Sequence, residues 1–166
     1  MRIFTIILCL LFSYNLHSQS WEYKKGGNTF DGEFKTANVK GKADNYPYNN
    51  PLLCINKFDN SDDFNFYISG SGFYQEQTGI KVQWVFDSEP NTIYLTSNTS
   101  ISNDGKILFF QHFSNPSGGP QIKNIEIFDK LQQANKVSIR ISDDYNTNNI
   151  TFSLSGSTKA INFVIP

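Results

Sequence analysis

Apolar and polar residues alternate with a period of two along much of the chain. The clearest run is 80–86 (IKVQWVF), in which every second residue is apolar before Val85 breaks the pattern. Similar runs occur at 64–68, 137–142 and 150–155. Strands with one buried face show this period. We therefore predict that these four segments line one core, with Trp84 and Phe152 inside it.

Two further segments, 52–58 and 107–113, are apolar on both faces for part of their length. This pattern is typical of central strands that are covered on both sides. Segments 33–40 and 92–97 bring the predicted number to about eight strands. Turn residues separate the strands, and the best hairpin turn is Asn103-Asp104-Gly105. Antiparallel pairing of neighbouring strands is therefore expected.

Only one helix is clearly indicated. Pro120 fits a first helical position, Asn135 fits a left-handed stop, and apolar residues recur at threes between them, at Ile122, Ile125, Phe128 and Leu131. The tail 157–164 fits either a short helix or a final strand. The pattern as a whole predicts a mainly β fold, an antiparallel β-sandwich or barrel-like domain of about eight strands with one packed α-helix near residues 121–134.

The first residues have the pattern of a secretory signal peptide. Arg2 precedes the apolar run Ile3–Phe12, and the small residues Ser18 and Ser20 follow. The run of about ten residues is shorter than the roughly 20 that a membrane-spanning helix needs. Cys9 lies inside the run and not at its end, which disfavours lipid attachment. We predict a signal peptide at 1–20, a single β-rich domain at 21–166, and a periplasmic or secreted bacterial protein.

Composition narrows the possible functions. The chain has 14 basic and 15 acidic residues, a net charge of −1 and no basic run, which argues against binding nucleic acid. Aromatic residues make up 15% and charged residues 17%, which argues against disorder. After removal of the predicted signal peptide, Cys54 is the only cysteine that remains and His112 is the only histidine. This inventory excludes an intrachain disulfide and disfavours a zinc site, so we expect no metal and no cofactor.

Candidate catalytic residues are few. A Cys54/His112 dyad requires that the two strands carrying these residues pair. Asp31 and Glu33 share one strand face by their spacing, and Glu76 or Glu89 could approach them, which is the inventory of a carboxylate-dependent glycoside hydrolase.

Two acidic turns, 59–63 and 143–146, offer carboxylate and amide oxygens. Either turn could hold calcium, but neither has the spacing of an EF-hand loop. Asp and Asn also favour turns through their local hydrogen bonds, so both turns are interpreted as solvated turns.

An aromatic loop is the best binding candidate. Tyr46-Pro47-Tyr48 is followed by Asn49, so two rigid tyrosines lie beside an amide group. Such a surface suits a sugar or a peptide. Tyr46, Tyr48 and Asn49 are therefore the predicted ligand-binding residues.

The C-terminal region resembles a known family. The stretches Ile125–Leu131, Ala134–Arg140 and Ile150–Ile161 follow the order helix, strand, polar loop, strand and small terminal helix. In this order and its hydrophobic spacing, the last 40 or so residues are similar to the invasion-associated locus B family of small exported bacterial proteins. The resemblance implies a β-sandwich with the helix packed at one end, and it implies no catalytic residues.

These observations favour an exported non-enzymatic domain that binds an envelope or extracellular partner, either a protein or a glycan. One alternative is a carbohydrate-binding module that uses the Tyr46/Tyr48 loop. The other alternative is the carboxylate-dependent glycoside hydrolase.

Overall fold

Antiparallel strands make up most of the described chain, which in the computed structural model comprises residues 20–28, 32–44, 50–61, 63–72, 79–114 and 122–166. These residues form ten strands in one sheet and two helices. The strands are β1 (Glu22–Asn28), β2 (Gly32–Ala43), β3 (Leu52–Phe58), β4 (Phe64–Ser69), β5 (Lys81–Phe86), β6 (Tyr94–Ile101), β7 (Ile107–Ser114), β8 (Ile122–Lys123), β9 (Lys136–Ser142) and β10 (Thr147–Ser153). The helices are α2 (Asn124–Gln133) and α3 (Ser157–Val164). The predicted mainly β fold with a packed helix is thus confirmed.

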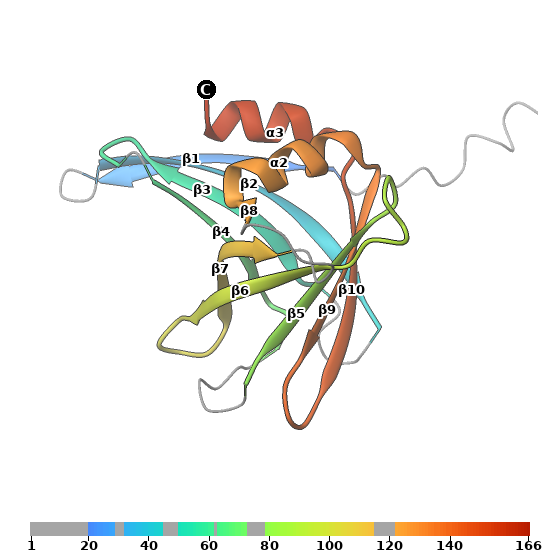
Figure 1. Ribbon diagram of the computed structural model, residues 1–166. Coiled ribbons are helices and arrows are strands. Elements are labelled where there is room, and N and C mark those ends of the chain that lie inside the picture. Colours follow the sequence, from blue (N-terminus) through green and yellow to red (C-terminus); the bar gives the residue numbers. More distant parts are fainter. Residues whose placement is uncertain (1–19, 29–31, 45–49, 62, 73–78, 115–121) are drawn as a thin grey trace, which may run out of the picture.

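The sheet closes on itself. Its strand order is β1-β2-β10-β9-β5-β6-β7-β4-β3, and β3 also pairs with β2. Eight strands therefore form a closed ring, while β1 continues the sheet beyond β2 and the short β8 pairs with β7. Figure 1 shows both helices at one end of the strands, near β1 and β2, and the β9–β10 hairpin at the opposite end.

The interior of the ring is filled with side chains, as expected for about eight strands. Trp84 on β5 is fully buried, and its ring centroid lies 5.0 Å from that of Phe110 and 5.6 Å from that of Phe66. Its indole Nε1 donates a hydrogen bond of 2.6 Å to Thr96 Oγ1. Phe152 on β10 is also fully buried. The predicted core positions of Trp84 and Phe152 are confirmed.

Helix α2 lies near the predicted place but differs in its start and in its buried face. Ile122, predicted inside the helix, belongs to β8, and Pro120 lies outside the described residues. Ile125, predicted on the packed face, is 49% exposed. Buried residues follow the helical spacing i, i+1, i+4 and i+7 instead, at Ile127, Phe128, Leu131 and Ala134. The predicted packing of Phe128 and Leu131 is thus confirmed, and that of Ile125 is wrong, because a period of exactly three drifts around a helix with 3.6 residues per turn.

The tail that fitted a helix or a strand is helix α3. Gly156 precedes the helix with φ 88, a left-handed conformation that glycine adopts without steric penalty. The hydroxyl of Ser157 donates a hydrogen bond of 2.7 Å to the carbonyl oxygen of Leu131, which ties the start of α3 to α2. Ala160, Ile161 and Val164 are the buried apolar residues of α3.

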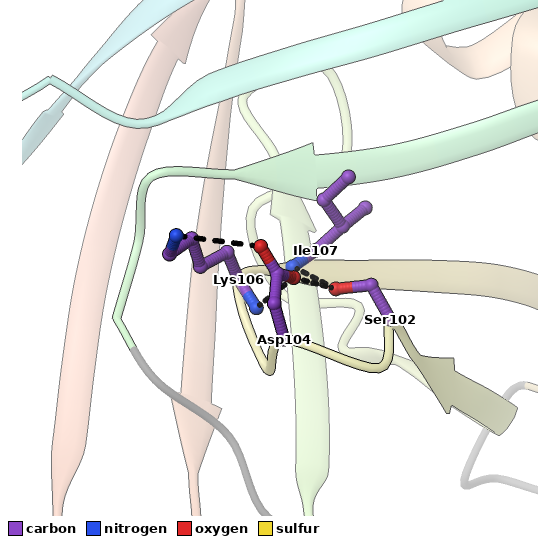
Figure 2. Close-up of polar contacts among 4 residues, drawn as sticks. All are labelled: Ser102, Asp104, Lys106 and Ile107. Atoms are coloured by element: carbon purple, nitrogen blue, oxygen red, sulfur yellow. Dashed lines mark hydrogen bonds and ion pairs between the residues drawn. The ribbon is translucent and has the colours of Figure 1, made fainter.

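The predicted hairpin turn between β6 and β7 is confirmed, and Figure 2 shows its polar contacts. The hydroxyl of Ser102 donates a hydrogen bond of 2.7 Å to Asp104 Oδ1, and the backbone N–H of Ile107 donates one of 3.0 Å to Ser102 Oγ. Lys106 Nζ lies 3.4 Å from Asp104 Oδ2. The Ser102 hydroxyl, followed by the Lys106 backbone N–H, holds the pKa of Asp104 below its ordinary value. Gly105 supplies the positive φ, 71, that the turn needs.

The predicted coverage of the two central strands is confirmed for one of them. On β3 the four consecutive residues 53–56 are buried, so both faces are covered at the centre of this strand, whereas Phe58 at its end is half-buried. On β7 the core face is buried at Leu108 and Phe110, but Gln111 is exposed. The outer face of β7 is thus partly open to solvent.

Candidate functional site

The predicted tyrosine loop lies outside the described part of the chain. Tyr46, Tyr48 and Asn49 lie outside the described residues, as do residues 1–19 of the predicted signal peptide. The assignment of this loop to ligand binding and the assignment of residues 1–20 to export therefore stay predictions. Among the described residues, no helix has the length and apolar character required to cross a membrane.

The carboxylates considered for hydrolysis are only partly described. Asp31 and Glu76 lie outside the described residues, while Glu33 is exposed on β2. Glu89 follows β5, and β10 and β9 lie between β2 and β5 in the sheet. The described members of the set thus come from separate parts of the ring.

Glu89 takes part in a local cluster that joins the β5–β6 turn to α2. Its carboxylate accepts a hydrogen bond from the Tyr94 hydroxyl and one of 2.9 Å from Lys130 Nζ. The ammonium of Lys130 also lies 4.8 Å from the centre of the Tyr94 ring. These two hydrogen bonds, that of Tyr94 above all, hold the pKa of Glu89 below its ordinary value. The geometry indicates a structural link, because both partners of Glu89 belong to packed elements.

The Cys54/His112 dyad is not formed. It required pairing of β3 with β7, but β4 lies between these strands. The side chains that hydrogen-bond to the Cys54 thiol are those of Tyr67 and Ser69. Burial raises the pKa of Cys54 to about 11, so the thiol is protonated and inert at neutral pH.

The two acidic turns form local hydrogen bonds. Asp143 Oδ1 accepts hydrogen bonds from the backbone N–H groups of Tyr145, at 2.9 Å, and Asn146, at 2.7 Å. In the other turn, the backbone N–H of Asp63 donates to Ser61 Oγ at 3.1 Å, and Asp62 is outside the described residues. In the described part of the chain, no three His, Cys, Asp or Glu side chains gather in a way that could hold a metal ion.

A groove on the outer face of β2, β3 and β4 is the strongest candidate site. The alternation of β2 places Ala37 and Val39 in the core, so Phe34 and Thr36 lie on the outer face. The strand register then sets Phe58 of β3 beside Phe34, and Asn56 beside Thr36. The resulting hollow has a volume of about 840 Å³ and is bordered by the β1–β2 hairpin (β1 to β4 in Figure 1).

Three aromatic rings line this groove: Phe34, Phe58 and Tyr67, each half-buried. The ring centroids of Phe34 and Phe58 lie 5.9 Å apart with the planes tilted by 58°. Tyr67 packs against Phe109 of β7 at 5.4 Å between centroids. Burial, followed by its interaction with Cys54, raises the pKa of Tyr67, so the hydroxyl stays protonated. The groove therefore presents flat, uncharged aromatic surface.

Glycine 26 makes room for the Phe34 ring. A Cβ atom at Gly26 would lie 2.6 Å from Phe34 Cζ, closer than real side chains approach one another. Gly26 and Phe34 are directly opposite in the β1–β2 register, so the ring lies across the β1 backbone. The absence of a side chain at Gly26 therefore makes room for one wall of the groove.

Neutral polar groups complete the lining. Asn56 is only 8% exposed, and its Nδ2 donates a hydrogen bond of 2.7 Å to Thr36 Oγ1. Asn28, Asn60 and Ser61 also border the hollow. Lys24 is the one charged side chain among the described lining residues.

A second hollow of about 530 Å³ adjoins the groove across β4. Its lining includes Asn65, Phe109 and Gln111. Asn65 is directly opposite Asn56 in the β3–β4 register, and Phe109 contacts Tyr67 of the first groove. The two hollows thus follow each other over the outer face of the sheet.

Sequence reasoning missed this groove because it requires the strand register. Alternation alone places Thr36 and Asn56 on the polar side of their strands, where they resemble ordinary solvent-facing residues. One indication was present, since segment 52–58 is apolar on both faces and ends in Phe58. An outward-facing phenylalanine on such a strand marks a covered or concave outer face.

Comparison with known proteins finds no matching family model, no matching curated protein and no matching solved structure. The resemblance of the last 40 or so residues to the invasion-associated locus B family therefore stays a prediction.

Proposed function

We propose that this chain is an exported, non-enzymatic domain that binds a partner in the bacterial envelope or outside the cell, and that the groove on β2, β3 and β4 is its binding site. The observation that carries this proposal is the set of half-buried rings on the outer face, where Phe34, Phe58 and Tyr67 line one hollow of about 840 Å³. Concave sites with aromatic walls and a few polar groups are the usual form of a binding site.

The placement of these rings favours binding. Each ring belongs to a paired strand, and sites on strands hold their geometry better than sites on loops. The Phe34 ring packs over Gly26, and the Tyr67 ring packs against Phe109. A partner therefore meets side chains that are already ordered, and little conformational entropy is lost on binding.

The proposal is tested by cosedimentation of the exported, purified protein with envelope fragments and with insoluble extracellular material of the producing cells. We expect the wild-type protein to sediment with one of these fractions. Phe58→Ala should weaken the apparent affinity by about tenfold, or about 1.4 kcal/mol, because a ring in the groove is lost.

Tyr145→Ala is the matched control, since Tyr145 is an 81% exposed aromatic residue in the turn between β9 and β10. Thermal unfolding of each variant shows whether it is folded. Binding to neither fraction would refute the envelope or extracellular role. Binding that is equal in wild type and in folded Phe58→Ala would refute the assignment of the groove.

A further inference from the structure

The groove has the chemistry of a site for an uncharged polysaccharide. We infer that its ligand is a linear, neutral glycan that runs across the strands, from the β1–β2 hairpin over β3 and β4 toward β7. This inference rests on the proposed binding function and names the class of ligand at the same site.

The strand register arranges the outer face in rows. Lys24, Thr36, Asn56 and Asn65 occupy opposite positions on β1, β2, β3 and β4, and so form one polar row. Adjacent strands lie about 4.8 Å apart, so three intervals extend over about 14 Å. A row that crosses the strands suits a linear ligand better than a compact one.

Aromatic side chains flank the polar row on both sides. Phe34 and Phe58 are opposite each other on one side of it. On the other side Tyr67 is opposite Phe109, and their rings are in contact. A sugar ring has apolar C–H faces and hydroxyl groups around its edge. The C–H faces can pack against the flanking aromatic rings, and the hydroxyls can form hydrogen bonds with amides, which both donate and accept.

The charge of the lining argues for a neutral ligand. Lys24 is the one charged residue in the described lining of the groove, and the lining of the second hollow adds Asp63 and His112. The two hollows together therefore do not present the cluster of lysines and arginines that an acidic polymer needs. An acidic polymer is usually held by several cations, and ionic contacts of that kind weaken strongly as salt increases.

The backbone argues against a peptide that adds a strand. Over the groove, β3 is paired with β2 on one side and with β4 on the other. Its N–H and C=O groups are engaged in the two ladders, so β-augmentation at the floor of the groove is excluded. Recognition must come from side chains, and apart from Lys24 the side chains of the polar row and its flanks are rings, amides and hydroxyls.

The test uses the exported protein and the fraction to which it binds. One portion of that fraction is digested exhaustively with protease and extracted with organic solvent, which leaves its polysaccharide. We expect the protein to bind this polysaccharide as it binds the untreated fraction. The affinity should change less than about twofold between about 0.05 M and about 0.5 M NaCl, because screening does not affect a neutral ligand.

Two substitutions at one position separate ring stacking from apolar contact. Phe58→Tyr keeps a ring face and should bind as wild type, whereas Phe58→Leu keeps an apolar side chain without a ring and should bind about tenfold more weakly. Tyr145→Ala is again the control, and thermal midpoints establish that the variants are folded.

The outcomes distinguish the two levels of the proposal. If groove-dependent binding is lost when the fraction is digested with protease, the inference of a glycan ligand is overturned. The proposed binding function then stands with a protein as the partner. If binding to the polysaccharide is lost at high salt, the inference that the ligand is neutral is overturned. Binding that Phe58→Leu leaves unchanged would overturn ring stacking. Failure of the proposed function itself is seen earlier, as the absence of groove-dependent binding to any untreated fraction.

Discussion

Glycine 41 on β2 offers a sharp test of how tightly the ring of strands is packed. Its backbone is not in the left-handed region, so glycine is not required there for its conformation. The space around it is the constraint. A Cβ atom at this position would lie 2.5 Å from Phe152 Cε1 and 2.9 Å from Ile150 Cγ2. Carbon atoms in good contact are about 3.5–4.0 Å apart, so Gly41→Ala forces a shift of about 1 Å.

The expected loss of stability follows from two opposed effects. Overpacking a core usually costs about 1–3 kcal/mol, whereas alanine in place of glycine stabilises by about 0.4–1 kcal/mol through the unfolded chain. We expect Gly41→Ala to lower the free energy of unfolding by about 1–2 kcal/mol. For a domain of this size the melting temperature should then fall by about 2–8 °C.

Urea unfolding followed by tryptophan fluorescence measures this loss, since Trp84 is fully buried. Phe152→Leu removes Cε1, the atom closest to the new methyl group, so Gly41→Ala should be better tolerated in that background. A double-mutant cycle should give a coupling of about 1 kcal/mol. The reasoning is refuted if Gly41→Ala is as stable as wild type, or if the two substitutions are additive within about 0.5 kcal/mol.

Three further outcomes are expected. Trp84→Ala should lower the free energy of unfolding by about 3–5 kcal/mol in urea unfolding followed by circular dichroism, because a filled position of the core is emptied. An unchanged midpoint would contradict the buried position of Trp84. Because burial raises the pKa of Cys54 to about 11, a thiol reagent at pH 8 should label it only after unfolding, and rapid labelling of the folded protein would contradict this. The folded state holds the pKa of Glu89 below its ordinary value, so the carboxylate stabilises the fold above its unfolded pKa and this contribution is lost as the pH falls through the folded pKa. Glu89→Gln should therefore flatten the acid side of the stability profile, and a profile that matches wild type would contradict the stabilisation of the Glu89 carboxylate by Tyr94 and Lys130.

The sequence predicts those elements whose apolar pattern is set by burial, on one face of the strand or on both. The predicted 52–58 coincides with β3, and 80–86 differs from β5 by one residue. Strand β1 was missed because its residues, EYKKGGN, are almost all exposed and show no alternation. That strand exists through its pairing with β2, which is a tertiary effect that no local pattern contains.

Closure of the ring and formation of the groove, like the presence of β1, depend on pairing between strands that are distant in the sequence. The polar identity of Thr36 and Asn56 can be read from alternation, but their 2.7 Å hydrogen bond depends on the register between β2 and β3. A shift of one residue would turn every side chain of a strand to the other face. The rings of Phe34 and Phe58 would then enter the core, and no aromatic groove would exist.

The core and the groove are therefore fixed by the same register. Leu53 and Ile55 of β3 are fully buried in the ring. Because burial of these two side chains is favourable, the alternate residues of β3 face outward. Because β3 is paired on both sides, its outward residues Asn56 and Phe58 have little freedom to move. The β1–β2 hairpin extends beyond the ring, and Gly26 lets Phe34 lie across it beside Phe58. A rigid core face and an ordered outer face thus arise from one set of strand pairings, which is the property that a preorganised binding surface requires.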